Sequence, residues 1–374
     1  MILERYIHSE ILSKLIWIIG LLILILASQR FVGYLADAAE GRLPGNLLFD
    51  MLGMKMLSMT PKLLPVALFV SVILAMSRLN RDRELTVVSS AGVADRFQIH
   101  AVLRFALVYS LLVAGIAFYL APWAELRLRD LNDIAKVESD VTGLRAGQFK
   151  EFSRGNRVVY VQKLTEDRRA MGNVFVQVRQ PDGASVVKAD SARYQTKATT
   201  GSRYVVFHNG RRYIGAPGKL DYRISHYRTY GVLLEQGVKE ASARRLEAYP
   251  TSELWRLKDS SHVPDRRRNW YKTELQWRLS YVLTSILLPL LGVALCRAGG
   301  ADQRYTPLLI AILIYFIYSN LLGISKTLMV RQELSIYTGL WWVHGLLAAV
   351  ILVLLKEHRI RFWYRRLSKR ARQA

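Results

Sequence analysis

The sequence lacks the residues that most enzymatic sites need. Its 374 residues include one cysteine, Cys296, so no disulfide can form within the chain. No HExxH or CxxC motif occurs, and the seven histidines are scattered singly, so no metal site is expected. There is neither a GxxxxGK[ST] phosphate loop nor a GxSxG nucleophile elbow. We therefore expect a non-catalytic chain without a cofactor of its own, whose energy comes from a partner.

Acidic residues are scarce, and the charged residues are kept apart from the apolar ones. The chain has 53 Lys and Arg against 29 Asp and Glu, which gives a net charge of +24. Its mean hydropathy is still +0.13, although 22% of the residues are charged. A basic chain of this kind suits an anionic membrane surface or an anionic cargo, and nucleic acid is the weakest alternative because much of the positive charge flanks apolar runs. The first apolar run is long and lacks a small-residue cleavage site, so we interpret it as a membrane span.

Long apolar runs are abundant, and they predict a polytopic α-helical membrane protein. About 20 mainly apolar residues are needed to cross a bilayer, and six segments meet this length. The alternative for any one segment is a buried core helix, but six such segments favour the membrane. The predicted spans cover residues 12–36, 57–77, 102–123, 275–295, 305–325 and 336–355.

Lys and Arg in the short loops predict the orientation. Cytoplasmic loops carry the excess of these residues. They gather between spans two and three and after span six, so both termini are expected in the cytoplasm and the long middle segment outside. Cys296, at the inner end of span four, should then be reachable from the cytoplasm alone. The basic residues are Arg78, Arg81, Arg83, Arg96 and Arg104 in the loop, and Lys356, Arg359, Arg361, Arg365, Arg366, Lys369, Arg370 and Arg372 in the tail.

The middle segment has the pattern of an all-β domain. Short runs rich in Val, Tyr and Phe alternate with turn signals, which is typical of a sandwich, a barrel or a jelly roll. The sequence therefore divides into spans one to three (1–124), a β domain (125–272) and spans four to six with a basic tail (273–374). Strands are predicted at 157–161, 173–178, 185–189, 204–207 and 222–225, and turns at 181–183, 208–210 and 216–218.

A short amphipathic helix is predicted in the loop between spans two and three, at 81–92. Leu85 and Val88 lie on one narrow apolar face, and Gly92 is a suitable C-terminal cap. Arg83 and Glu84 supply charge at its start. Such a helix is suited to docking in a groove of a cytoplasmic partner, and resting on lipid headgroups is the equal alternative.

Three cations lie at the outer level of three different spans. Arg30 interrupts span one, Lys62 opens span two and Lys326 ends span five. A charge at this depth is a functional-site hypothesis, although the spacing alone favours snorkelling of Arg30 to the interface. Span five also carries Tyr315 and Phe316, which are candidates for an apolar wall beside the cargo, or for ordinary core packing. Three cations at one level, on three spans, predict a ring around an anionic group.

Seven short motifs, taken in order, are similar to the lipopolysaccharide-export permeases of the LptF/LptG family, and most like the LptF branch. The resemblance covers essentially the whole chain. Gly33 departs from it, since a second cation is expected there, one turn after Arg30. The motifs are Arg5-Tyr6, Gln29-Arg30, Glu40-Gly41-Arg42-Leu43-Pro44, Glu84-Leu85-Thr86-Val87, Ala91-Gly92, Gly147-Gln148-Phe149 and Glu274-Leu275-Gln276-Trp277-Arg278.

The resemblance implies a place in an ABC transporter of the bacterial inner membrane. It implies an LptG-like second permease, a dimeric LptB-like ATPase that binds ATP and Mg²⁺, and periplasmic partners of the LptC and LptA type. The β domain would be a periplasmic jellyroll that receives lipopolysaccharide extracted from the membrane.

Two alternatives belong to other classes of protein. A membrane-anchored sensor with a ligand-binding β domain would need a signalling output inside, and only a short basic tail follows span six. An enzyme acting on membrane lipids would need a nucleophile or metal. Ser325 and Lys326 are adjacent on a helix and point in different directions, so they make a poor catalytic dyad.

Overall fold

The computed structural model describes residues 2–40, 43–92, 96–142, 146–152, 157–165, 170–180, 183–196, 203–215, 222–235, 246–299 and 306–371. These form two compact units. One, which we call the helical unit, comprises Met1–Arg30, Leu52–Leu128 and Arg245–Ala374. The other, the sheet unit, comprises Phe31–Met51 and Arg129–Arg244.

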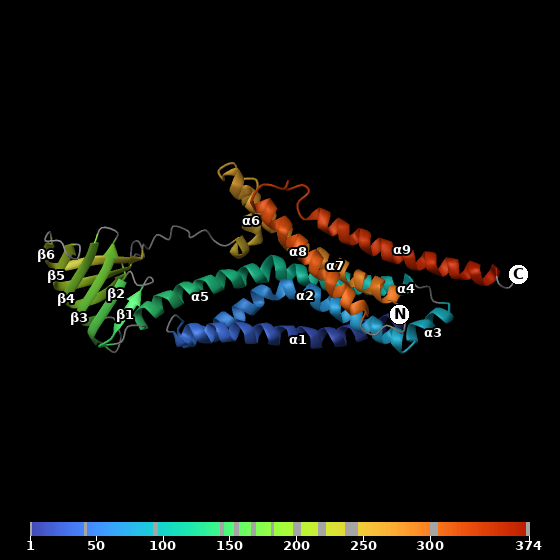
Figure 1. Ribbon diagram of the computed structural model, residues 1–374, viewed down its shortest axis with the longest axis horizontal. Helices are drawn as coiled ribbons and strands as arrows, with labels where there is room; N and C mark the ends of the chain where they lie inside the picture. Colours follow the sequence, from blue (N-terminus) through green and yellow to red (C-terminus); the bar gives the residue numbers. More distant parts are fainter. Residues whose placement is uncertain are drawn as a thin grey trace. The chain divides into compact units, whose positions relative to one another are not determined.

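Five helices of the described residues are long and apolar enough to cross a membrane. They lie where the first five spans are predicted, because each predicted segment is a long and mainly apolar run (Figure 1). They are α1 (Ile2–Ala39), α2 (Leu48–Arg81) preceded by the 3₁₀ turn η1 (Gly45–Leu47), α4 (Arg96–Gly115) continuing through the π-helical turn η2 (Ile116–Leu120) into α5 (Ala121–Thr142), α7 (Asp265–Gly299) and α8 (Thr306–Val330).

The sixth predicted span begins later than expected. Helix α9 (Trp341–Ala371) starts five residues after the predicted start, and its apolar part, Trp341–Lys356, is shorter than the other five spans. A turn precedes it because Gly339 has a φ of +37° and the Gln276 side chain binds the turn. Gln276 Nε2 donates to the Ile336 carbonyl at 2.8 Å. Five spans are thus confirmed as helices of spanning length, and α9 supplies a shorter sixth.

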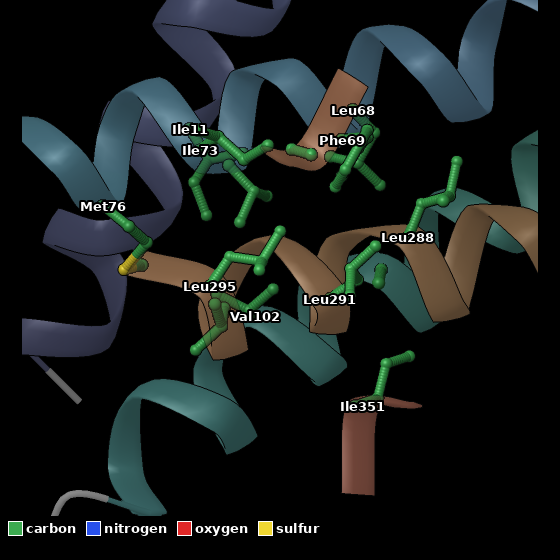
Figure 2. Close-up of a cluster of buried hydrophobic side chains, with 14 of the residues drawn as sticks. Ile11, Leu68, Phe69, Ile73, Met76, Val102, Leu288, Leu291, Leu295 and Ile351 are labelled. Atoms are coloured by element: carbon green, nitrogen blue, oxygen red, sulfur yellow. The ribbon is translucent and has the colours of Figure 1, made fainter. Parts of the chain in front are cut away.

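The core of the helical unit lies between α2 and α7. Gly292 of α7 lets the two backbones approach closely, since a Cβ there would lie 3.1 Å from Ile73. Figure 2 shows the surrounding side chains pointing toward one another from several helices. By contrast, α1 and α8 keep most of their apolar surface open, as helices that face lipid or a partner do. The labelled core residues are Ile11, Leu68, Phe69, Ile73, Met76, Val102, Leu288, Leu291, Leu295 and Ile351.

The sheet unit contains one six-stranded antiparallel sheet in which each strand pairs with the next in sequence. The prediction of an all-β insert is confirmed: four of the predicted strands fall within β2 to β5, and the fifth, 222–225, begins one residue before β6. The sheet occupies 149–235, so the described residues at both ends of the predicted β domain are mainly helical. The strands are β1 (Phe149–Phe152), β2 (Arg157–Leu164), β3 (Ala170–Gln180), β4 (Gly183–Thr196), β5 (Arg203–Gly215) and β6 (Arg223–Glu235).

The predicted turn at 208–210 is wrong, because these residues lie inside β5. Asn209 has a φ of 51°, a left-handed conformation that Asn tolerates, and the strand continues beyond it. Asn173 of β3 has a φ of 50°. The register places Asn173, Asp190 and Asn209 in one row across the sheet, since Gly172 pairs with Ser191 and Ala189 with Gly210. The predicted turns at 181–183 and 216–218 fall wholly or mainly outside the described residues.

Candidate functional site

A buried ion-pair cluster lies at the start of α7. Glu274 and Arg278 are one helical turn apart, and each side chain is 3% exposed. Arg278 Nε lies 3.3 Å from Glu274 Oε1. From α8, Lys326 Nζ lies 3.4 Å from Glu274 Oε2. A buried carboxylate is stable only when it is paired, so one carboxylate here serves two cations.

Lys326 is therefore not a free cation. Besides its pair with Glu274, its ammonium lies over the ring of Trp277, 4.5 Å from the centroid. About a quarter of the side chain, 24%, stays exposed. Ser325 on the same helix accepts a hydrogen bond from Trp342 Nε1 at 3.0 Å. Ser325 and Lys326 thus have different partners, as expected for adjacent residues on a helix.

Arg278 binds the segment that returns the chain from the sheet to the helical unit. Nη1 donates to Thr251 Oγ1 at 2.7 Å. Nη2 donates to the carbonyls of Tyr249 at 2.9 Å, Glu247 at 3.2 Å and Leu246 at 3.3 Å. These carbonyls belong to η3 (Leu246–Ala248) and to the residues before α6 (Thr251–Leu257). Arginine suits this role because its planar fork presents five donors in fixed directions.

Thr251 extends this contact to the other connection of the sheet. Its hydroxyl donates to the Phe118 carbonyl. Phe118 lies in the π-helical turn η2, where widening of the helix changes the backbone pairing. This turn leads directly into α5, which runs on toward β1. We call Glu274, Arg278 and Thr251, with the four carbonyls they reach, the Arg278 clasp.

A cavity of about 130 Å³ adjoins the clasp. It would hold roughly four water molecules, so it fits a phosphate-sized group better than an acyl chain. Three basic and three acidic residues line it, and Lys55 Nζ lies 3.6 Å from Glu125 Oε2. The wall is thus balanced in charge rather than purely basic. The lining residues are Lys55, Ser58, Met59, Pro61, Lys62, Ala117, Ala121, Pro122, Glu125, Glu247, Glu274, Trp277, Arg278 and Tyr281.

The three predicted cations differ in their surroundings. Lys62 is exposed and lines the cavity, and Lys326 lies against Glu274 and Trp277 of the same wall. Arg30 is exposed on α1. On α8, Tyr315 packs partly buried against the helical core, whereas Phe316 is 63% exposed. Phe316 therefore lies on the open face of α8, and Tyr315 is partly a core residue.

The second candidate site is the short helix α3 (Glu84–Ser90), inside the region predicted as an amphipathic helix. Arg83 precedes it with a φ of 57°, and Gly92 follows with a φ of +84°, the geometry of a glycine cap. Leu85 is buried and Val88 partly buried, so the apolar face packs against the helical unit. Glu84 is about one-third exposed at 34%.

Glu84 belongs to a network of ionic contacts around Arg78 of α2. Arg78 Nη1 lies 2.7 Å from Glu10 Oε2, and Nη2 lies 3.8 Å from Glu84 Oε1. Its Nε faces Asp82 Oδ2 at 3.3 Å. The nearby Glu84 carboxylate raises the pKa of Tyr6 above its usual value. These contacts tie α3 to α1 and α2, and they leave Glu84 partly open to a further donor.

Cys296 is unsuited to report the topology. The thiol is 2% exposed, and its sulfur lies 3.5 Å from Ser77 Oγ. The prediction that it labels from one side overlooked this burial, since a position near a span end gives no indication of how α2 and α7 pack.

The Arg278 clasp was missed by sequence reasoning. Glu274 and Arg278 entered only as part of a family motif. Their spacing of four residues, at the polar start of a span, is the signal available, because side chains at this spacing meet on a helix. The other partners of Arg278 lie about 30 residues earlier in the chain, and no pattern in the sequence predicts a contact at that distance. Among the described residues no group of His, Cys, Asp and Glu could hold a metal ion.

Comparison with known proteins gives one consistent result. The family model for the lipopolysaccharide export system permease LptF/LptG matches residues 5–357. The chain is 26% identical over 357 residues to the lipopolysaccharide export system permease protein LptF of Escherichia coli K12, covering 95% of this chain and 94% of that one. The LptF proteins of E. coli O157:H7 and Shigella flexneri match to the same extent. The chain is therefore a polytopic membrane protein with an inserted β domain, and it belongs to the LptF/LptG family of lipopolysaccharide export permeases.

Proposed function

We propose that this chain is one permease subunit of an ABC transporter that extracts lipopolysaccharide from the inner membrane. The observation that carries the proposal is the family match, which extends over the helices and the sheet alike. An LptG-like permease would complete the membrane part. The open apolar faces of α1 and α8 give such a partner, or the acyl chains of the cargo, a surface to contact.

The energy would come from a dimeric LptB-like ATPase that binds ATP and Mg²⁺. The sequence has no phosphate loop of its own. Helix α3 supports docking of that ATPase, since Glu84 is open enough to accept a donor while Leu85 anchors the helix. Arg83, Val88 and Gly92 fix the ends and inner face of the same helix.

The cargo would enter from the outer leaflet and pass to the sheet. Lipopolysaccharide carries phosphates above its acyl chains, and Arg30, Lys62 and Lys326 are the cations we assign to them. The pairing of Lys326 with Glu274 makes it a weaker clamp than Arg30, because the phosphate must compete with a carboxylate. Phe316 and Tyr315 would face the acyl chains.

We place the chain in the bacterial inner membrane with both termini in the cytoplasm and the sheet in the periplasm. The basic loop between α2 and α4 supports this orientation. LptC-like and LptA-like proteins would then receive the cargo from the sheet, which serves as the first jellyroll of the bridge.

Purification from native membranes tests the proposal. A tagged chain should bring down a second permease of similar size and an ATPase, and purified lipopolysaccharide should stimulate ATP hydrolysis by the complex. A chain that purifies alone, and whose sheet binds a small ligand, would point to the sensor alternative instead.

A further inference from the structure

The two segments that connect the six-stranded sheet to the helical unit meet at one side chain. The outgoing connection passes through η2 into α5, and the return connection passes through η3 into α6. Thr251 donates to the carbonyl of Phe118 in the first, and Arg278 binds three carbonyls of the second. Arg278 also donates to Thr251 itself. One residue of α7 therefore fixes both connections.

The same arginine is joined to a candidate cargo residue. Glu274 divides its two oxygens between Arg278 and Lys326, at 3.3 and 3.4 Å. Glu274 and Arg278 are nearly inaccessible to water, whereas Lys326 is partly open. Lys326 is thus the most accessible of the three charges to an anion arriving from solvent. Coulomb interactions are stronger where water is excluded, so a change in the charge around Lys326 alters the interaction energy between Glu274 and Arg278.

We infer that Arg278 is a positioning residue, and that Glu274 makes its hold on the two connections depend on whether Lys326 binds a cargo phosphate. The inference rests on the proposed function. When a phosphate binds Lys326, Glu274 pairs with Arg278 alone, and the contacts of the Arg278 clasp become stronger. By linkage, a tight clasp also favours the anion at Lys326. The cation that loads the cargo is thereby coupled to the segments that lead to the sheet.

Two variants separate this role from simple stability. Arg278→Lys keeps the charge beside Glu274 but loses the fork that reaches Thr251 and the three carbonyls. Glu274→Gln keeps the shape but removes the charge that links Arg278 to Lys326. Arg256→Lys, an exposed position on α6, is the matched control.

The experiment uses the complete complex in vesicles that contain lipopolysaccharide. Photo-crosslinking residues replace Phe316 on α8 to report loading, and Phe149 on β1 to report arrival at the sheet; both positions are exposed. We expect Arg278→Lys to lower the ratio of arrival to loading at least about fivefold, since several charge-assisted hydrogen bonds are lost. Loading itself should stay within about twofold, given that Lys326 keeps its partner. Arg256→Lys should leave the ratio unchanged.

Glu274→Gln gives the second readout. Amide hydrogen exchange across residues 116–121 and 246–251 should slow on addition of lipopolysaccharide in the unmodified chain and stay constant in this variant. Equal losses of loading and arrival in Arg278→Lys, or cargo-dependent protection that survives Glu274→Gln, would overturn the inference. Absence of cargo at both positions in the unmodified complex would instead reject the proposed function. Recovery of the ATPase with each variant checks assembly.

Discussion

Arg78 of α2 binds Glu10 of α1 through Nη1 and Oε2 at 2.7 Å, and the same guanidinium faces Glu84 at the start of α3. The short helix is therefore joined to two spans and is not a loose appendage. Because Glu10 is only 12% exposed, this pair holds its geometry better than a surface ion pair. A partner that binds α3 would transmit force directly to α1 and α2.

Glu84→Ala should uncouple ATP hydrolysis from export. The variant removes an acceptor that we assign to a cation of the ATPase, and such a loss weakens binding about tenfold when the other charge is left unpaired. Asp82→Ala is the matched control, since Asp82 also contacts Arg78 but is not assigned to the partner. ATPase retained on the purified complex is the measurement. Equal retention in both variants would show that Glu84 acts only through Arg78.

Arg30→Glu should reduce crosslinking of lipopolysaccharide to α1, and Arg30→Lys should be milder. Arginine binds phosphate through two parallel hydrogen bonds, whereas lysine offers a single point charge. Because Arg30 is exposed, we expect a loss of a few-fold up to about tenfold rather than more. The comparison with Lys62→Glu and Lys326→Gln ranks the three cations. Unchanged crosslinking after Arg30→Glu identifies this residue as an interfacial anchor.

Cysteine labelling tests the topology once the buried thiol is removed. In a Cys296→Ser background, Ser90→Cys at the end of α3 and Ser261→Cys after α6 both offer exposed positions. An impermeant maleimide should label residue 261 in cells with a permeabilised outer membrane, and residue 90 only after the inner membrane is opened. The reverse pattern rejects the orientation inferred from the basic loops.

Gly210→Ala should destabilise the sheet. A Cβ at this position would lie 2.3 Å from both the Lys188 carbonyl and the Tyr227 hydroxyl. These two atoms already share a hydrogen bond of 3.2 Å, and burial raises the pKa of Tyr227 to about 12. We expect a loss of roughly 1–3 kcal/mol, typical of an overpacked site.

Faster trypsin cleavage between residues 149 and 235 measures this loss in the intact complex. Gly231→Ala is the control, since no atom lies within 4 Å of a Cβ added there. Equal cleavage of the two variants would contradict the prediction, because it would mean that β5 shifts at Gly210 and so avoids the clash.

Sequence patterns predicted the elements that have a regular period along the chain, and they missed the contacts between residues that lie far apart in sequence. Apolar runs located five spans, and alternating Val, Tyr and Phe located the strands, because burial imposes those periods. Residues 208–210, which include Asn209 of the row across the sheet, were predicted as a turn, since Asn and Gly are typical of turns and also occur at irregular positions inside strands. Apart from Glu274, the partners of Arg278 lie about 30 residues from it in sequence and are mostly backbone carbonyls, which any residue type supplies. Burial of Cys296 likewise depends on the packing of α7 against α2.

The π-helical turn at Ile116–Leu120 also absorbs one residue without turning the helix that follows it. A wide turn of this kind holds one residue more than a regular turn, so α5 keeps the face that it would have on a regular helix. Deleting one residue of the turn would therefore regularise the helix from α4 into α5 and leave α5 facing nearly the same way. A deletion in the regular part of α5 would instead rotate the rest of that helix by about 100° around its axis. The loss of a residue is thus better tolerated in this turn than in the regular helix on either side of it, although it would displace the Phe118 carbonyl that Thr251 binds.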